Sequence, residues 1–270
     1  MTSTSESTKR SPQVKTAAVV THGHVDVESA VERLRAVAAK AGVTLVDDPH
    51  EVDLVVVLGG DGTMLRTLAR LLGTDVPVIG VNYGRVGFLA SIRPEDLDRD
   101  LARVFAGEYV IVELPTIQVR LDGERHVAVN DVVVTSSALG RMVELSWAIG
   151  GEELGTVPCD GMICSTPSGS TAYNLSNGGP VLVRGLDAMA VTFIAPHSLH
   201  ARPFVVPRGV EVTAQNATVD VPASLLVDGQ RVAEVAPGDD VAIYLCNERS
   251  LLATLPETTF FSRYRETFSS

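Results

Sequence analysis

The sequence predicts an α/β N-terminal domain with a parallel sheet, followed by a β-rich C-terminal domain, so that the chain is α+β overall. Two apolar runs, Asp53–Leu58 and Val76–Val81, show no polar alternation, as expected for parallel strands covered on both faces. Segments with helical spacing follow the strands of this half, which indicates βα units. From Tyr109 onward, β-branched runs alternate apolar and polar residues, which is typical of antiparallel strands. We place the domain boundary near residue 108.

The N-terminal domain is expected to span residues 14–107, after a leader (residues 1–13) that lacks an apolar region and is predicted to be disordered. Asp26 is placed to cap the first helix, and Gly42 to end it. The expected elements are strand 16–21, helix 27–41, strand 43–46, strand 53–58, helix 63–72, strand 76–81 and helix 94–105.

The C-terminal domain is expected to span residues 108–253 and to consist mostly of short strands. Asp122-Gly123 predicts a hairpin turn between the first two of them. A Gly/Ser-dense segment, 165–180, interrupts the strands. The expected strands are 116–121, 127–135, 143–149, 191–194, 210–214, 224–227 and 241–245.

Charge and composition exclude several classes of partner. The chain has 33 acidic and 22 basic residues, for a net charge of −11, which argues against a nucleic-acid or membrane partner bound through charge alone. No apolar run approaches the roughly 18 residues of a membrane span. Three cysteines in a spacing that fits no zinc or redox motif predict reduced thiols and a cytoplasmic location.

The sharpest local motif is Gly59-Gly60-Asp61-Gly62, between a buried strand and a helix. Glycines let backbone N–H groups approach an anion closely, and the helix N-terminus adds donors and a positive dipole end. A carboxylate is unfavourable beside phosphates unless a cation or a substrate hydroxyl accompanies it. The motif therefore favours phosphoryl transfer, with Asp61 accepting the proton of the attacking hydroxyl. The alternative is a tight turn in which Asp61 only caps the helix.

Two further polar segments stand out. Asn130-Asp131 interrupts the apolar strand 127–135, so its side chains either find buried partners or line a cleft, or else mark an edge or bulge. Residues 165–176, STPSGSTAYNLS, are suited to bind sugar hydroxyls and a flat ring, or else form a flexible turn before a short helix. Dinucleotide (G-x-G-x-x-G), P-loop and nucleophile-elbow motifs are missing from the sequence.

Together these segments resemble the NAD kinase family, over roughly residues 14–255. Similar GGDG turns occur in diacylglycerol, sphingosine and 6-phosphofructokinases, so the resemblance depends on the combination with TPSGSTAY. The matching segments are Gly59–Leu65, Gly80–Asn82, Gly87–Leu89, Asn130-Asp131 and Ser165–Ser176.

The resemblance implies that Asp61 is the catalytic base for the 2′-hydroxyl of the adenosine ribose of NAD. Asp131 stands where the family usually has Glu, so we expect its ribose contact to be mediated by water. Asp160 commonly comes from a neighbouring subunit. The implied binding residues are Gly59, Gly60, Gly62, Arg66, Phe88, Asn130, Asp131, Arg141, Asp160, Ser168, Thr171, Ala172, Tyr173, Ser176 and Gln230.

The implied reaction transfers the γ-phosphoryl group of ATP, or a phosphoryl group of inorganic polyphosphate, to the substrate NAD and gives NADP. Mg²⁺ or another divalent cation accompanies ATP, and no protein metal site is expected; we interpret His197 and His200 as structural or interfacial. The resemblance also implies a homodimer or homotetramer, an active site in the interdomain cleft, and residues 254–270 completing the first domain. The alternatives are an NAD-binding sensor without activity and a lipid or sugar kinase sharing the GGDG turn.

Overall fold

The computed structural model describes residues 12–21, 28–84, 87–198 and 201–268. The chain divides into two compact units, residues 1–113 with 250–270, and residues 114–249. Both boundaries fall inside long strands, β5 (Val110–Leu121) and β16 (Asp240–Thr254). Asp26, which we predicted as a helix cap, His200 and nearly all of the predicted leader lie outside the described residues.

The first unit is built on a parallel sheet, as predicted. Its central strand β3 (Leu54–Gly59) is buried at every residue, which explains the apolar run without alternation. Each neighbouring pair of strands in this sheet is parallel. The strand order is β2 (Thr44–Val46), β1 (Thr16–Thr21), β3, β4 (Val78–Asn82) and then the end of β16.

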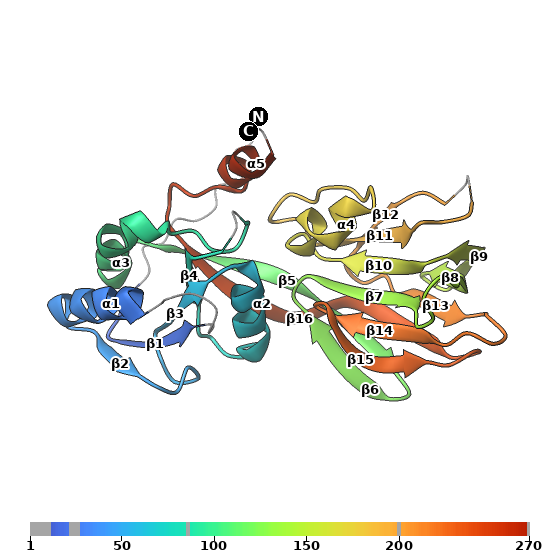
Figure 1. Cartoon of the computed structure of the whole chain (residues 1–270), viewed down its shortest axis with the longest axis horizontal. Coiled ribbons are helices and arrows are strands. Elements are labelled where there is room, and N and C mark those ends of the chain that lie inside the picture. Colours follow the sequence, from blue (N-terminus) through green and yellow to red (C-terminus); the bar gives the residue numbers. More distant parts are fainter. Residues whose placement is uncertain (1–11, 22–27, 85–86, 199–200, 269–270) are drawn as a thin grey trace. The chain divides into compact units, whose positions relative to one another are not determined.

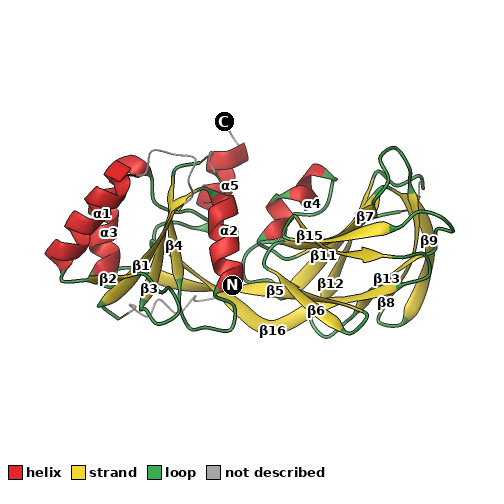
Figure 2. Ribbon diagram, turned by 60° about the horizontal axis from the view of Figure 1, so that its bottom comes forward, coloured by secondary structure: helices red, strands yellow, loops and turns green. Residues whose placement is uncertain are grey.

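Helices cover both faces of this sheet. On one face α1 (Glu28–Ala41) packs beside α3 (Leu97–Phe105), and α2 (Asp61–Arg70) lies on the other face (Figure 2). Leu34 of α1 and Phe105 of α3 are fully buried in one apolar cluster with the sheet. This layered arrangement places the N-terminus of α2 directly after the carboxyl end of β3, where open parallel sheets bind ligands.

The strands of the second unit form two antiparallel sheets, one of which continues through β16 into the parallel strands of the first unit (Figure 1). Val132 and Val134 of one sheet and Leu145 and Ile243 of the other belong to one buried cluster, so the two sheets pack face to face. One sheet has the order β12 (Phe204–Pro207), β11 (Ala188–Ile194), β10 (Gly161–Ser165), β7 (Asp131–Ser136), β14 (Ala223–Val227), β15 (Gln230–Val235). The other contains β16, β13 (Val212–Asn216), β8 (Val143–Ile149) and β9 (Glu152–Cys159), and β5 pairs with both β16 and β6 (Glu124–Ala128).

The predicted single strand 127–135 is wrong. The chain leaves β6 after Ala128 and begins β7 at Asp131, and the two strands belong to different sheets. The break arises because the backbone N–H groups of Val129 and Asn130 donate to the Asp228 carboxylate, at 2.9 and 2.7 Å, instead of to a neighbouring strand. The predicted Asp122-Gly123 hairpin is confirmed, with φ angles of 51° and 83° that suit a tight two-residue turn between β5 and β6.

Candidate active site

Asp61 is the first residue of α2, and its carboxylate binds a distant loop. The carboxylate accepts the backbone N–H of Phe88 on Oδ2 at 2.6 Å, and those of Leu89 and Ala90 on Oδ1 at 3.1 and 3.3 Å. Gly60 is the N-cap of α2 and no side chain caps it. The interpretation of Asp61 as a helix cap is therefore wrong, and we call residues 88–90 the Asp61-binding loop.

Gly87 makes this contact possible. A Cβ atom at Gly87 would lie 2.3 to 2.6 Å from the carboxylate atoms of Asp61, closer than real Cβ contacts come. The residue that precedes the Asp61-binding loop must therefore be glycine for the carboxylate to reach the loop backbone. This accounts for the Gly-Phe-Leu segment that follows β4 in the sequence.

Arg66 lies on the first turns of α2, close to the glycine motif. Its Nη2 donates to Thr63 Oγ1 at 3.3 Å, and its Nη1 lies 3.9 Å from the position of a Cβ on Gly62. Gly59 is buried and Gly60 is half-buried, whereas Gly62 and Arg66 are exposed. A cation beside a helix N-terminus is a favourable arrangement for phosphate groups.

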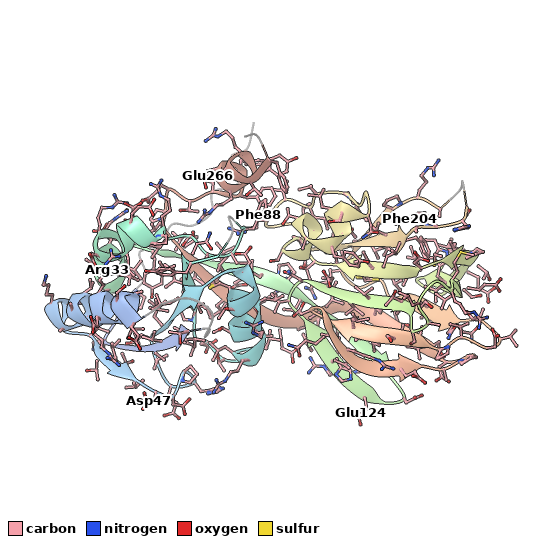
Figure 3. The ribbon with its side chains drawn as sticks, viewed as in Figure 1. Arg33, Asp47, Phe88, Glu124, Phe204 and Glu266 are labelled. Atoms are coloured by element: carbon pink, nitrogen blue, oxygen red, sulfur yellow. The ribbon has the colours of Figure 1, made fainter. Side chains whose placement is uncertain are left out.

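Phe88 contributes its ring as well as its backbone. The ring centroid lies 5.9 Å from that of Phe260 and 5.7 Å from that of Phe268, both on α5 (Phe260–Phe268). Figure 3 labels Phe88 near this helix, which also carries the labelled Glu266. The structure thus brings Asp61, its binding loop and the C-terminal helix together in the first unit.

In the second unit, Asn130 and Asp131 lie at the start of β7 and face a third polar residue, Asp228. The Asp228 carboxylate accepts the N–H groups of Val129, Asn130 and Asp131, and these donors oppose the rise in its pKa that burial causes. Burial and the neighbouring Asp228 charge raise the pKa of Asp131 to about 7. The backbone donors favour the charged form of Asp228, whereas burial and the Asp228 charge favour the neutral form of Asp131.

The 165–176 segment packs directly on Asn130. Thr166 donates through Oγ1 to the carbonyl of Val129 at 2.7 Å and through its N–H to the carbonyl of Asn130 at 2.8 Å. A Cβ on Gly169 would lie 2.2 Å from the Asn130 carbonyl oxygen, so glycine is required there. Asn130 Oδ1 is buried and has no partner among the described residues, which leaves it available to a ligand.

Buried hydrogen bonds of Asn174 fix the rest of this segment. Asn174 is fully buried; it donates to the carbonyls of Ser170 and Pro180 and accepts from Thr192 Oγ1 at 2.7 Å. The predicted site residues of the segment are half-buried or exposed: Ser168, Thr171, Ala172, Tyr173 and Ser176. The hydrogen bonds of Asn174 hold the segment in a fixed conformation, so it is not a flexible turn. They leave the predicted site residues at the surface.

The structure does not bring Arg141 and Asp160 to Asn130-Asp131 within one chain. In the β7–β10 pair, Asp131 lies opposite Ser165, whereas the Asp160 carbonyl binds the N–H of Ser136 at the other end of β7. These ends are about 16 Å apart at roughly 3.3 Å per residue. Arg141 forms an exposed ion pair with Asp220 at 3.0 Å.

Gln230 and Asp228 share one turn. Gln230 is exposed at the start of β15, directly after the Asp228-Gly229 turn, whose φ angles are 48° and 77°. Sequence reasoning gave no role to Asp228 or Asn174. For Asp228 a signal was present, since Asp-Gly between two apolar runs predicts a two-residue hairpin turn that fixes the side chain before Gln230. For Asn174 there was none.

Cys159, Cys164 and Cys246 are free and buried, and burial raises the pKa of Cys159 and of Cys164 to about 12, so neither thiol is activated. Within the described ranges no group of three or more His, Cys, Asp or Glu could hold a metal ion. Among the described residues, no helix combines the length and apolarity that crossing a bilayer requires.

Comparison with known proteins identifies the family. The model of the ATP-NAD kinase N-terminal domain matches residues 3–109, and that of the ATP-NAD kinase C-terminal domain matches residues 129–255. The chain belongs to the NAD kinase family. An NAD kinase from Heliobacterium modesticaldum is 41% identical over 82% of this chain and 80% of the relative. One from Gemmatimonas aurantiaca is 36% identical over 84% and 80%, respectively.

Solved structures of the family share this fold. A yeast NADH kinase complexed with NADH superposes with a TM-score of 0.85 at 20% identity, covering 95% of this chain and 88% of that one. An NAD kinase from Archaeoglobus fulgidus in complex with ATP gives a TM-score of 0.79 at 26% identity, covering 94% and 97%. The two-domain NAD kinase fold, α/β followed by β-rich, is therefore confirmed.

Proposed function

We propose that the chain transfers the γ-phosphoryl group of ATP to the 2′-hydroxyl of the adenosine ribose of NAD, giving NADP and ADP. The observation that carries the proposal is Asp61, fixed by three backbone donors at the start of α2, in a member of the NAD kinase family. Relatives named NAD kinase and the relative solved with ATP support this choice of acceptor and donor.

Asp61 has room for one more hydrogen bond. A carboxylate offers about four acceptor positions, and the described residues fill two on Oδ1 and one on Oδ2. The remaining position on Oδ2 accepts the proton of the attacking hydroxyl. Because phosphoryl transfer needs little covalent help, this hydrogen bond acts mainly by orienting the hydroxyl for in-line attack.

Asn130 and Asp131 bind the NAD ribose in this proposal. Asn130 Oδ1, buried and without a partner among the described residues, supplies an acceptor, and Asp131 in its protonated form supplies a donor. Because Asp131 is one methylene shorter than Glu, its contact passes through a water molecule. The other proposed contacts to NAD come from Phe88, Ser168, Thr171, Ala172, Tyr173, Ser176 and Gln230.

Arg141 and Asp160 contribute from a neighbouring subunit in this proposal. The separation between the two ends of β7 supports it, because one chain does not bring Asp160 to Asn130. A homodimer or homotetramer would supply both groups.

The triphosphate lies over Gly59, Gly60 and Gly62, near Arg66, and brings its own divalent cation. The residues present fit a cation carried by ATP, since Mg²⁺ usually keeps several waters and is held largely by substrate phosphates, and the described residues form no group of three or more His, Cys, Asp or Glu that could hold a metal ion. Such a cation would supply neutralisation of the phosphate charge, while Arg66 and the backbone of the glycine motif would hold the triphosphate.

The test is NADP formation by the purified chain, followed with an NADP-specific dehydrogenase. NAD with Mg-ATP is expected to give NADP, and inorganic polyphosphate is compared as the donor in the same assay. If the chain binds NAD saturably but forms no NADP with either donor, it is an NAD-binding sensor and not a kinase. Neither binding nor product would direct the search to lipid and sugar acceptors.

A further inference from the structure

The Asp61-binding loop is held from its other side by the C-terminal helix α5. Arg263 on α5 donates through Nη2 to the backbone carbonyl of Ala90 at 2.5 Å. The N–H of the same residue, Ala90, donates to Asp61 Oδ1 at 3.3 Å. One residue of the loop therefore connects the guanidinium of Arg263 to the carboxylate of Asp61.

A second contact joins the same two segments. The ring of Phe88, at the start of the loop, lies against Phe260 and Phe268 of α5, with centroids 5.9 and 5.7 Å apart. The helix thus contacts the side chain of Phe88, the first residue of the loop, and the backbone carbonyl of Ala90, the last residue of the loop. Both of these residues donate to Asp61.

The helix α5 is itself fixed to the first unit. Thr259 and Ser262 cap its start, with Oγ atoms accepting backbone N–H groups at 3.0 and 3.1 Å. Just before it, Glu257 pairs with Arg103 of α3 at 2.6 Å. A helix held in this way can serve as a support for the loop.

Arg263 is poorly explained by stability alone. It is 7% exposed, and among the described residues its guanidinium has one ion pair, with the mostly exposed Glu266 at 3.2 Å, besides the bond to Ala90. Its Nε is buried and has no acceptor among the described residues. A buried cation that is incompletely paired contributes little net stability, because desolvation offsets the attraction.

We propose that Arg263 is a positioning residue for Asp61, because it fixes the Ala90 carbonyl and through it the backbone donors that orient the carboxylate. This inference rests on the proposed function, in which Asp61 orients the ribose hydroxyl. It extends the active site to α5, which contributes no atom to the reacting groups. The consequence is that loss of the Arg263 contact lowers turnover while NAD binding is retained.

The first test compares Arg263→Met and Arg263→Lys with two controls. Arg265→Ala removes an exposed cation of the same helix, and Glu266→Gln removes the ion pair but leaves the Ala90 contact. Arg263→Met is expected to lower kcat roughly 10- to 100-fold, since small misplacements of a catalytic group have effects of this size, with the KM for NAD changed less than about 3-fold. Arg263→Lys, which keeps one donor, should retain more activity, and both controls should stay within about 2-fold of wild type.

A double-mutant cycle separates positioning from a general structural role. If Arg263 acts through Asp61, Arg263→Met lowers single-turnover rates in the wild-type background but has no further effect in Asp61→Asn. An equal loss in both backgrounds, or a kcat loss matched by the unfolded fraction, would overturn the proposal. Arg263→Lys serves in the same cycle if Arg263→Met does not fold.

Amide hydrogen exchange provides a readout independent of activity. Arg263→Met is expected to speed exchange of the Phe88, Leu89 and Ala90 amides, and Arg265→Ala to leave it unchanged. Unchanged exchange in Arg263→Met would contradict the link between α5 and the loop. If the wild-type chain forms no NADP, the proposed function fails, and the exchange result still decides whether Arg263 fixes the loop.

Discussion

Asp228 and Asp131 are joined in both directions: the Asp228 N–H donates to the Asp131 carbonyl at 3.0 Å, and the Asp131 N–H donates to the Asp228 carboxylate at 3.2 Å. The turn between β14 and β15 is thereby fixed to the start of β7. The two carboxyl groups share a buried environment, which raises the pKa of both, and the three backbone donors oppose this rise for Asp228.

Asp131→Asn is expected to change how stability depends on pH. The folded pKa of Asp131, about 7, exceeds its ordinary value of 3.8, so its contribution is fully present below pH 4 and is lost as pH rises through 7. Relative to wild type, the variant should gain stability between pH 5 and pH 8, by at most about 3 kcal/mol. Urea unfolding at both pH values measures this. The exposed Glu124→Gln is the control, and an Asp131→Asn difference independent of pH would contradict the prediction.

Asp228→Asn is expected to weaken NAD binding. The new amide NH₂ cannot accept the backbone N–H groups that both carboxylate oxygens now bind, so the β6–β7 break loses its fixed geometry. We expect the Kd for NAD to rise about 10-fold and the free energy of unfolding to fall by about 1–3 kcal/mol. Calorimetric titration with NAD measures the first, and Asp240→Asn, at an exposed strand start, is the matched control. Unchanged NAD affinity would show that Asp228 is only a turn residue.

Gly87→Ala is expected to abolish most turnover. The added Cβ would meet the Asp61 carboxylate at 2.3 to 2.6 Å, so either the carboxylate or the Asp61-binding loop must move. We expect kcat to fall at least about 10-fold, with NAD binding retained. Gly73→Ala is the control, because its φ of 77° strains an alanine backbone but nothing lies within 4 Å of the added atom. Equal kcat values for the two variants would contradict the role of Gly87.

Periodicity and turn chemistry predicted most of the first unit. The buried run 53–58 and the glycine motif after it located β3 and the start of α2, where Asp61 is found. Sequence patterns did not predict the contact of Asp61 with Phe88–Ala90, because that contact is tertiary and depends on how closely Gly87 lets the loop approach. Nothing local in residues 260–268 indicated a role for Arg263.

The second unit was predicted less completely. The apolar residues of 127–135 favoured one continuous strand, whereas the Asp228 carboxylate, 98 residues away from Asn130, ends one strand and starts the next. Strand β9 was missed because it is exposed over most of its length and carries little alternation. The polar pair Asn130-Asp131 marked the position of this break, since two polar residues interrupted the apolar run there.

The most direct measurement is the rate of NADP formation from NAD and Mg-ATP by wild type and by Asp61→Asn, with NAD affinity measured on the same samples. Wild type is expected to form NADP, and Asp61→Asn to do so roughly 100-fold more slowly or worse, with the Kd for NAD changed less than about 3-fold. Near-normal turnover in Asp61→Asn would remove Asp61 from the reaction and contradict the mechanism proposed for this site.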